Sequence, residues 1–454
     1  MRPPLLVLAI SLALAQAANA AQSPGAAGQG RIEALEARIK ALEANAEAMR
    51  QQAEAASAAL EATRAEMEAM KTATETASSD AAAEDTGEPA PTAAPESANG
   101  NAFNPAINIV LNGSYTGHSL DPDAYQRSGF PLVGDGAPAA KGLSLGESEI
   151  SFAANIDDKF YGQLTLAIGS DDGNTTLGVE EAFVDATTLP GGIALRVGRF
   201  FSNIGYLNSH HAHTDKFFDR PLPYQAFLGN QYGDDGVQLR WVAPTALFLE
   251  VGAELFRGQN YPSGGAANAG AGVRTLFAHA GGDVGNENEW LAGVSVLDSS
   301  SAGSDDGFFG DSRLYIPDAT WKWAPEGNFK DGGVTVRGEY FLDDRDGDYV
   351  DPHQLLPNQA WKGKRRGAYV EGVYRINRRW EAGYRYDRLW ADDSGPFASD
   401  FDPVRHSVML SWLNSEFSLV RLQYSHDQPN NNDTDNAITL QYQMNLGAHG
   451  AHKF

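Results

Sequence analysis

The sequence predicts an all-β transmembrane barrel of about 16 antiparallel strands, preceded by a periplasmic α-helical coiled coil. Two observations lead to the barrel. From about residue 107 to residue 454, runs of roughly ten residues alternate apolar and polar side chains, with short turns and long polar loops between them. Beyond residue 20, no apolar stretch is long enough to form a spanning helix. Strands are therefore expected to cross the membrane, with one row of side chains toward lipid and the next toward a lumen.

The composition narrows the range of functions. The 454 residues contain no cysteine, which excludes disulfides, thiolate metal sites and a cysteine nucleophile. The formal net charge of −25 argues against nucleic acid or an anionic surface as a partner. Such a chain is better suited to attract cations.

Residues 1–20 have the composition of a secretory signal peptide. Arg2 supplies a positive start, residues 5–15 form a short apolar core, and Ala18-Asn19-Ala20 matches a small-residue cleavage site. The mature chain is therefore expected to be exported.

Residues 30–71 follow an unbroken heptad pattern, and oppositely charged pairs such as Arg31 and Glu36 flank it as in a parallel coiled coil. This segment is expected to associate with copies of itself, with a lone alanine-rich helix as the alternative. The pattern by itself favours dimers, whereas porin barrels are usually trimers; a homotrimer is expected, and the dimer stays open. The a positions are Ile32, Ile39, Ala46, Ala53, Leu60 and Met67, and the d positions are Leu35, Leu42, Met49, Ala56, Thr63 and Met70.

Residues 72–102 are expected to be a disordered tether, because they consist of Ala, Thr, Pro, Glu and Ser with almost no large apolar side chain. The barrel is expected to occupy residues 103–454. Its terminal aromatic residue, Phe454, fits recognition by the barrel-assembly machinery.

Compact reversals that contain Gly, Pro, Asn or Asp divide the barrel into strand pairs and are expected at the periplasmic rim. They lie at residues 157–158, 189–192, 243–245, 285–286, 325–328, 377 and 414–415. Long polar loops fall between them and are expected outside the cell. They lie at residues 119–142, 170–177, 202–233, 258–271, 300–310, 343–362, 391–402 and 427–436.

The alternation also assigns a face to each strand residue. In the last strand, Ile438, Leu440 and Tyr442 belong to the lipid row, while Thr439 and Gln441 belong to the lumen row. The other strands give a polar lumen with both signs of charge. In a barrel of about sixteen strands, such a lumen leaves an aqueous channel.

Charged residues in the lumen row are candidates for lining the channel, because rings of opposite charge select ions by sign. The alternative is that they only keep the lumen hydrated. Arg199 lies an odd number of residues from Arg196, so both face the lumen only if a bulge intervenes. The anion-attracting candidates are Arg196, Arg199, Arg337, Arg385 and Arg421, and the opposing acids are Glu250, Glu254, Glu339 and Asp387.

The predicted outer loop 202–233 contains a cluster of metal-binding residue types. His210, His211, His213 and Asp215 lie within six positions, and these donors suit Zn²⁺ or a similar divalent ion. The spacing is not that of a helix, so a solvated histidine loop is an equal alternative. If the loop folds into the channel, it is expected to form a constriction.

A second loop is predicted around Gly347. Asp344, Asp346 and Asp348 offer oxygen ligands at alternate positions and resemble the start of a calcium loop, although the distant glutamate of an EF-hand is missing. The alternative is an acidic loop held by bridging ions at a lipopolysaccharide surface.

No enzymatic activity is expected. The sequence has no nucleophile elbow, no glycine-rich phosphate loop and no helical zinc-protease motif. His406 and Ser407 are adjacent on a predicted strand, so they point to opposite faces and cannot share a proton.

With its signal, coiled coil, tether and barrel, the chain resembles the phosphate-selective porin superfamily and its coiled-coil-bearing trimeric relatives. Residues 146–152, residues 180–184 through 196–200 and the histidine loop resemble outer-membrane proteins labelled zinc-regulated receptors. The resemblance covers about residues 103–454 and implies uptake of zinc or a zinc-linked ligand. Energised receptors need a folded plug inside about twenty-two strands. Here a coiled coil and a tether precede the barrel, so passive or facilitated diffusion is expected.

The expected function is an outer-membrane porin-type channel for small solutes or ions, with no required cofactor and with zinc or calcium as candidate ions. Its expected partners are copies of itself, outer-membrane lipid and lipopolysaccharide, and the assembly machinery. The alternative is a metal-capturing outer-membrane binding protein with little conductance.

Overall fold

The computed structural model describes residue 40 and residues 105–171, 174–264, 270–351, 358–397 and 399–447. The signal peptide, the coiled coil apart from Lys40, the tether and Phe454 lie outside these residues. The barrel is described below by itself.

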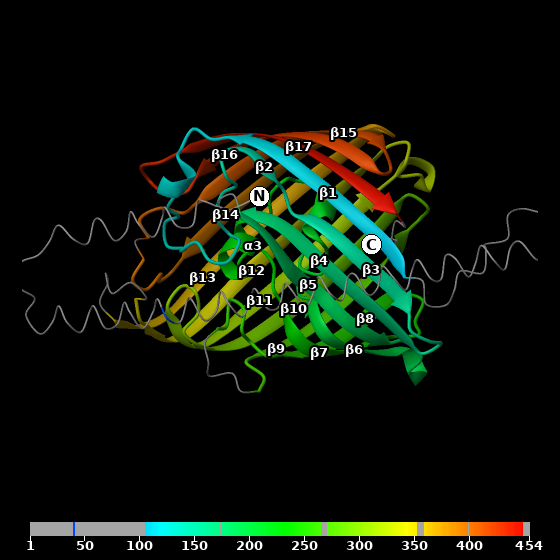
Figure 1. The fold of residues 1–454 in the computed structure, drawn as a ribbon, viewed down its shortest axis with the longest axis horizontal. Helices are drawn as coiled ribbons and strands as arrows, with labels where there is room; N and C mark the ends of the chain where they lie inside the picture. The colour runs from blue at the N-terminus through cyan, green and yellow to red at the C-terminus, as the bar shows by residue number, and fades with distance from the viewer. Residues whose placement is uncertain are drawn as a thin grey trace, which may run out of the picture. The chain divides into compact units, whose positions relative to one another are not determined.

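The described strands form one closed antiparallel sheet in which β1 pairs with both β2 and β3, each strand from β3 onward pairs with the next along the chain, and β17 pairs with β1 (Figure 1). The strands are β1 (Ala106–Gly117), β2 (Gly142–Leu145), β3 (Ser148–Asn155), β4 (Phe160–Asp171), β5 (Asn174–Ala186), β6 (Ile193–Phe201), β7 (Gly233–Val242), β8 (Phe248–Phe256), β9 (Val273–Val284), β10 (Asn288–Ala302), β11 (Phe308–Trp323), β12 (Gly333–Tyr349), β13 (Gln359–Asn377), β14 (Trp380–Ala391), β15 (Val404–Ser415), β16 (Ser418–Gln428) and β17 (Asp435–Gly447). Short helical segments lie between them: η1 (Pro122–Ala124), η2 (Pro190–Gly192), η3 (Ala212–Thr214), α3 (Leu222–Phe227) and η4 (Pro325–Gly327).

These segments occupy sixteen positions around the barrel, as the sequence predicts. The short β2 and the longer β3 both pair with β1, so they are two parts of one interrupted strand. The interruption falls at Gly146, where a side chain would come within 2.8 Å of the Asn112 amide group. Closure leaves no free sheet edge among the described strands.

The predicted compact turns are confirmed, but three predicted loops are largely strand. Residues 170–177, 300–310 and 343–362 were expected as loops because they are polar, and β4, β5 and β10 to β13 extend through most of them. Cross-strand pairs satisfy their polar side chains, as when Lys364 Nζ of β13 lies 3.6 Å from Asp344 Oδ2 of β12. Polarity by itself therefore does not end these strands.

The predicted alternation of faces is confirmed in the last strand. Ile438 and Leu440 are 54% and 49% exposed on the outer surface, whereas Thr439 and Gln441 are each 4% exposed on the inner side. This outward apolar row is the one expected to meet lipid.

The segment 202–232 between β6 and β7 folds into the barrel, and the prediction of an outer position for it is wrong. Its backbone donates hydrogen bonds to wall side chains on well-separated strands: Gly205 N to Ser295 Oγ, Phe218 N to Gln423 Oε1 and Leu222 N to Asp387 Oδ1. In Figure 1, α3 lies among the strands of the barrel. None of the described helices is long and apolar enough to cross a membrane.

Apolar packing explains why this segment enters the lumen. All six residues of α3 are buried, and Leu222, Tyr224, Ala226 and Phe227 join a cluster with inward-facing residues of the wall. Burying such side chains is favourable, whereas an exterior loop would leave them in water. The prediction of a polar lumen is therefore wrong near the long loops. The wall residues of this cluster are Phe183, Phe200, Phe256, Val273, Leu297, Leu314, Ile316, Phe341, Tyr369 and Leu389.

Candidate metal centre

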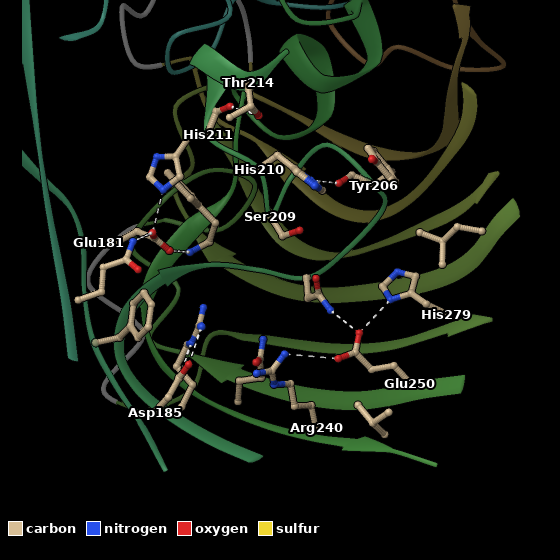
Figure 2. Close-up of a pocket in the computed structure, with 18 of the residues that line it drawn as sticks. Glu181, Asp185, Tyr206, Ser209, His210, His211, Thr214, Arg240, Glu250 and His279 are labelled. Atoms are coloured by element: carbon tan, nitrogen blue, oxygen red, sulfur yellow. Dashed lines mark hydrogen bonds and ion pairs between the residues drawn. The ribbon is translucent and has the colours of Figure 1, made fainter. Parts of the chain in front are cut away.

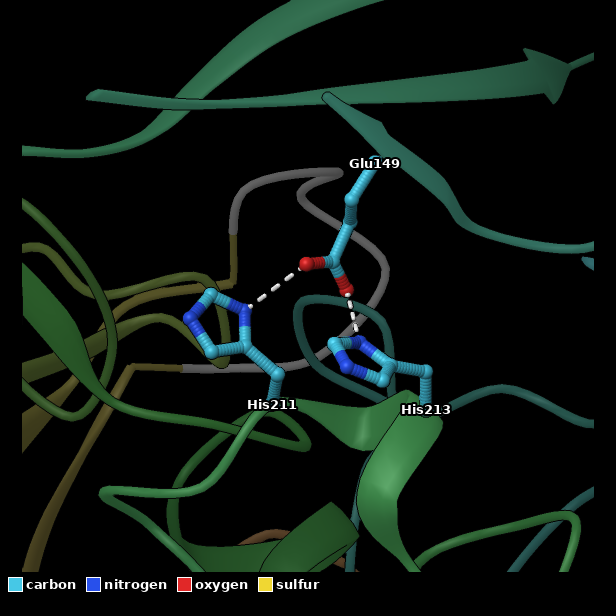
Figure 3. A group of neighbouring side chains, drawn as sticks. All are labelled: Glu149, His211 and His213. Atoms are coloured by element: carbon cyan, nitrogen blue, oxygen red, sulfur yellow. Dashed lines mark hydrogen bonds and ion pairs between the residues drawn. The ribbon is translucent and has the colours of Figure 1, made fainter. Parts of the chain in front are cut away.

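Two histidines of the inward-folded segment converge on a carboxylate of the barrel wall. His213 Nδ1 lies 2.7 Å from Glu149 Oε1, and His211 Nδ1 lies 3.0 Å from Glu149 Oε2 (Figure 3). Their potential ligand atoms lie within 4.8 Å of one another. One carboxylate and two imidazoles form a donor set that Zn²⁺ commonly takes in proteins.

More carboxylates surround the same imidazole. His211 Nε2 lies 3.0 Å from Glu181 Oε2, and His211 Nδ1 lies 3.2 Å from Glu180 Oε2. His211 Nδ1 is buried, but the angles to these carboxylates do not give it a hydrogen bond. Glu147, Glu149 and Glu180 form a second group whose oxygens could share a cation. The centre therefore carries more negative charge than its histidines can neutralise.

A β-bulge aims two consecutive glutamates at the centre. In the β4–β5 ladder, Thr165 pairs with Glu181 while Leu166 pairs with Val179, so Glu180 is the extra residue. Consecutive strand residues normally face opposite sides, and a bulge locally breaks that rule. This irregularity allows both Glu180 and Glu181 to reach His211.

The electrostatics at His211 follow from this crowding. Burial opposes protonation of the imidazole, but the carboxylates of Glu149, Glu180 and Glu181 outweigh burial and raise the pKa of His211 well above its ordinary value of 6.5. The site thus favours a cationic group at this position, which is either a proton on His211 or a bound metal ion.

The centre opens onto a cavity of about 1280 Å³ (Figure 2). The cavity extends toward the compact turns, since its lining includes Asn155, Val242, Asp283 and Glu289 beside those turns. Its wall carries six carboxylates and two guanidinium groups. The carboxylates are Glu149, Glu181, Asp185, Glu250, Asp283 and Glu289, and the guanidinium groups belong to Arg196 and Arg240.

The other two members of the predicted zinc cluster lie apart from the centre. The His210 ring stacks on Tyr206 at a centroid distance of 4.7 Å, and its Nδ1 lies 2.7 Å from the Tyr206 carbonyl oxygen. Asp215 accepts a hydrogen bond from Arg220 Nε at 3.0 Å. The structure thus brings together two of the four predicted residues and adds Glu149.

Most of the predicted channel-lining charges face inward and contact the segment 202–232 or another wall residue. Glu339 accepts hydrogen bonds from Tyr206 N and Tyr224 Oη, each at 3.0 Å. Arg421 donates to the Asp215 carbonyl oxygen at 2.8 Å. The remaining contacts are Glu254 with Asn203 N at 2.9 Å, Glu250 with Asn203 Nδ2 at 3.3 Å, Arg337 with Glu371 at 3.1 Å, Arg385 with Asp219 at 3.1 Å, and Asp387 with Leu222 N at 3.2 Å.

Arg196 and Arg199 lie on opposite faces. Arg196 is buried in the lumen wall and makes a bidentate pair with Asp185, at 2.7 and 2.8 Å. Arg199 pairs with Asp235 at 2.8 Å, and its side chain is 41% exposed in the same outer row as Val197. No bulge brings Arg199 inward, so the structure does not group it with the other predicted lining residues.

The predicted calcium loop is part of β12, and the loop prediction is wrong. Asp344, Asp346 and Asp348 occupy alternate positions on that strand, where Asp344 pairs with Lys364 and Asp346 with Lys362. An extended strand cannot wrap its oxygens around one ion as a calcium loop does. Cross-strand lysines supply the positive charge instead.

Sequence reasoning missed the carboxylates of the centre. Glu147 and Glu149 lie at alternate positions beside the β2–β3 interruption, and Glu180 and Glu181 are consecutive acids in an otherwise alternating strand. Consecutive acids in such a strand indicate a bulge, and this was the available signal. Glu181 meets His211, thirty residues further along, and Glu149 meets His213, 64 residues further along, so these contacts depend on the path of the loop.

Comparisons with known proteins agree with the fold. No protein-family model matches the chain. An uncharacterised protein of Aquifex aeolicus is 27% identical over 390 residues, covering 78% of this chain and 80% of that protein. An anion-selective porin from Comamonas acidovorans aligns with a TM-score of 0.50 and 10% identity, covering 75% of this chain and 99% of that one. The outer-membrane channel DcaP of Acinetobacter baumannii aligns with a TM-score of 0.48 and 13% identity, covering 75% and 97%. The alignment with the Comamonas acidovorans porin shows that the barrel has the fold of outer-membrane porins.

Proposed function

We propose that this chain is an outer-membrane porin-type channel that takes up divalent metal cations of the zinc class. The observation that carries the proposal is the convergence of His211 and His213, from the inward-folded segment, on Glu149 of the wall at the edge of a cavity. A solvated histidine loop would need no such partner. Here the histidines stand where a solute that crosses the lumen would pass.

The charge of the cavity supports a cation as the solute. Six carboxylates and two arginines line it, and Arg196 is neutralised by its pair with Asp185. Arg240 pairs with Glu250 at 3.5 Å, so the remaining four carboxylates give the cavity a net negative charge. Such a charge concentrates cations and raises their rate of entry. The same charge disfavours phosphate, which the resemblance to phosphate-selective porins would otherwise suggest.

The direction of transport follows from the orientation expected of an outer-membrane barrel, with compact turns in the periplasm and long loops outside. A cation would then enter past the long loops, bind at Glu149, His211 and His213, and leave through the cavity beside the turns. In this proposal the chain assembles as a homotrimer, contacts lipopolysaccharide with its outer rim, and is inserted by the barrel-assembly machinery.

Zinc titration of the full-length protein in detergent tests the site. The parent is expected to bind Zn²⁺ tightly, and the double variant His211→Ala/His213→Ala is expected to lose that binding. His210→Ala is the matched control, because it removes an imidazole of the same segment that lies outside the centre. Equal tight binding by the parent and the double variant would overturn the metal centre.

A metal-capturing receptor with little conductance is the second candidate, and the apolar packing of the segment 202–232 favours it. This packing fills the lumen near the long loops with buried side chains such as Leu222 and Phe227. Planar-bilayer recording separates the two functions. Ion current through well-folded protein supports the channel, whereas zinc binding without current supports the receptor.

A further inference from the structure

A second group of cation-binding residue types faces the same lumen on strands β8 to β12. Register places Glu250 of β8 opposite His279 of β9, His279 opposite Gly293 of β10, and Gly293 opposite Asp318 of β11. Glu339 of β12 follows as the partner of Asp318. Residues directly opposite each other on adjacent strands share a face. These residues therefore form one inward-facing row across five neighbouring strands.

Gly293 leaves a gap in this row. A side chain there would come within 2.3 Å of Asp318 Oδ2 and 2.4 Å of His279 Cδ2. The carboxylate and the imidazole thus lean toward each other across the glycine, into space that any other residue would fill.

Asp318 is a buried carboxylate without a hydrogen-bond partner. Asp318 is 6% exposed, and neither of its carboxylate oxygens accepts a hydrogen bond. The adjacent Glu339 accepts hydrogen bonds from Tyr206, Tyr224 and Tyr369. Leaving a buried carboxylate without a hydrogen bond is costly, and either a proton or a cation bound beside Asp318 would relieve that cost.

His279 is oriented to provide a second ligand. Its Nδ1 lies 3.5 Å from Glu250 Oε2, while Cδ2, on the other side of the ring, faces Gly293. Metal-binding histidines commonly direct one ring nitrogen to a carboxylate, which leaves the other nitrogen available for the metal. Figure 2 shows Glu250 and His279 across the cavity from His211 and Glu181.

We propose that Asp318 and His279, on either side of Gly293, form a second divalent-cation site in the lumen. This inference rests on the proposed function, since the site would receive the cation that the first centre binds. Two protein ligands give weaker binding than the three of the first centre. A site for transit must bind strongly enough to accept an ion and weakly enough to release it.

The test is calorimetric titration of the full-length protein in detergent with Zn²⁺ alone. The parent is expected to show one tight and one weaker site. Asp318→Asn keeps the shape of the side chain and is expected to weaken the second site at least about tenfold, the lower end of what a disturbed metal site loses. Gly293→Ala removes no charge but fills the gap, and it is expected to have the same effect.

Asp283→Asn is the matched control, because it removes a carboxylate that lines the same cavity but lies away from Gly293. It is expected to keep both sites, and circular dichroism checks that every variant retains the barrel. If Asp318→Asn leaves the affinity of the weak site unchanged, the second site is overturned and the proposed function is not. The same holds if the parent binds Zn²⁺ at the tight site but shows no weak site. Absence of the tight site from the parent overturns the proposed function.

Discussion

The segment 202–232 meets the barrel wall in two chemically different ways. Around Asp219, charges are balanced, because two carboxylates face two guanidinium groups. Asp219 lies 3.1 Å from Arg385 and 2.8 Å from Arg405, and Asp387 lies 3.0 and 3.5 Å from the same two arginines. Gln423 also donates a hydrogen bond to Asp219 at 2.6 Å. Around His211, charges are unbalanced, because the carboxylates of Glu149, Glu180 and Glu181 converge on one imidazole.

This difference separates anchoring from binding. A buried ion pair holds its position when both charges are satisfied, and removal of one partner is costly. A cluster with excess negative charge is stable only when a cation arrives, which is a proton or a metal ion. We therefore expect changes at Asp219 to release the segment and changes at the histidine end to alter ligand binding.

The largest expected effect is at the balanced end. Asp219→Asn removes the nearer of the two carboxylates beside Arg405 and one of the two beside Arg385, which should lower the free energy of unfolding by about 3 kcal/mol. The segment should then move more freely, and single-channel conductance in planar bilayers should rise. Asp402→Asn, in an exposed pair with Arg388, is the control. Equal conductance in the two variants would show that Asp219 does not hold the segment in place.

Glu149→Gln should have the next largest effect, at the unbalanced end. It removes the carboxylate shared by His211 and His213, so Zn²⁺ affinity should fall by at least about 100-fold, the upper end for loss of an outer-shell partner. Conductance should change little, because Asp219 still anchors the segment. Glu289→Gln, at the far end of the cavity, controls for loss of one negative charge. If Glu149→Gln and Glu289→Gln lost a comparable amount of Zn²⁺ affinity, the binding would reflect the overall negative charge of the cavity and not a specific metal centre.

Acid should weaken the balanced end. Burial favours the neutral form of Asp219, but Arg405 and Arg385 outweigh it and lower the pKa of Asp219 from 3.8 to about 2. The charged form thus contributes stability in full above its unfolded pKa of 3.8, and this contribution is lost as pH falls through about 2. The conductance of the parent should approach that of Asp219→Asn over this range. If the ratio of the two conductances stayed constant from pH 6 to pH 2, Asp219 would not be the group that holds the segment in place.

The smallest effect should be at the paired aspartates of β12. Asp346→Asn breaks an exposed contact with Lys362, and exposed pairs contribute little. Calcium titration should give the same result for variant and parent, and thermal unfolding should not change measurably. A loss of calcium binding would restore the calcium site that the strand geometry argues against.

Much of the barrel could be predicted because its signal is local. Alternation in β17 assigned Ile438 and Gln441 to opposite faces, and turn residues such as Asn286 marked the reversals. Strand ends were less predictable, because polar residues such as Asp344 and Lys364 continue the ladder by pairing across it. The site was predicted only in part: His211 and His213 were identified, but their partner Glu149 lies 62 residues earlier than His211 in the sequence.

The sequence by itself determined the closed antiparallel barrel, the face of most strand residues and the presence of metal-binding residue types in the segment 202–232. These depend on a period of two and on turn chemistry, which neighbouring residues encode. Only the tertiary structure decided that this segment lies inside, that the bulge at Glu180 aims two acids at His211, and that Gly293 leaves a gap between His279 and Asp318. Those features depend on packing between residues far apart in the chain, and no local pattern specifies which distant side chains will meet.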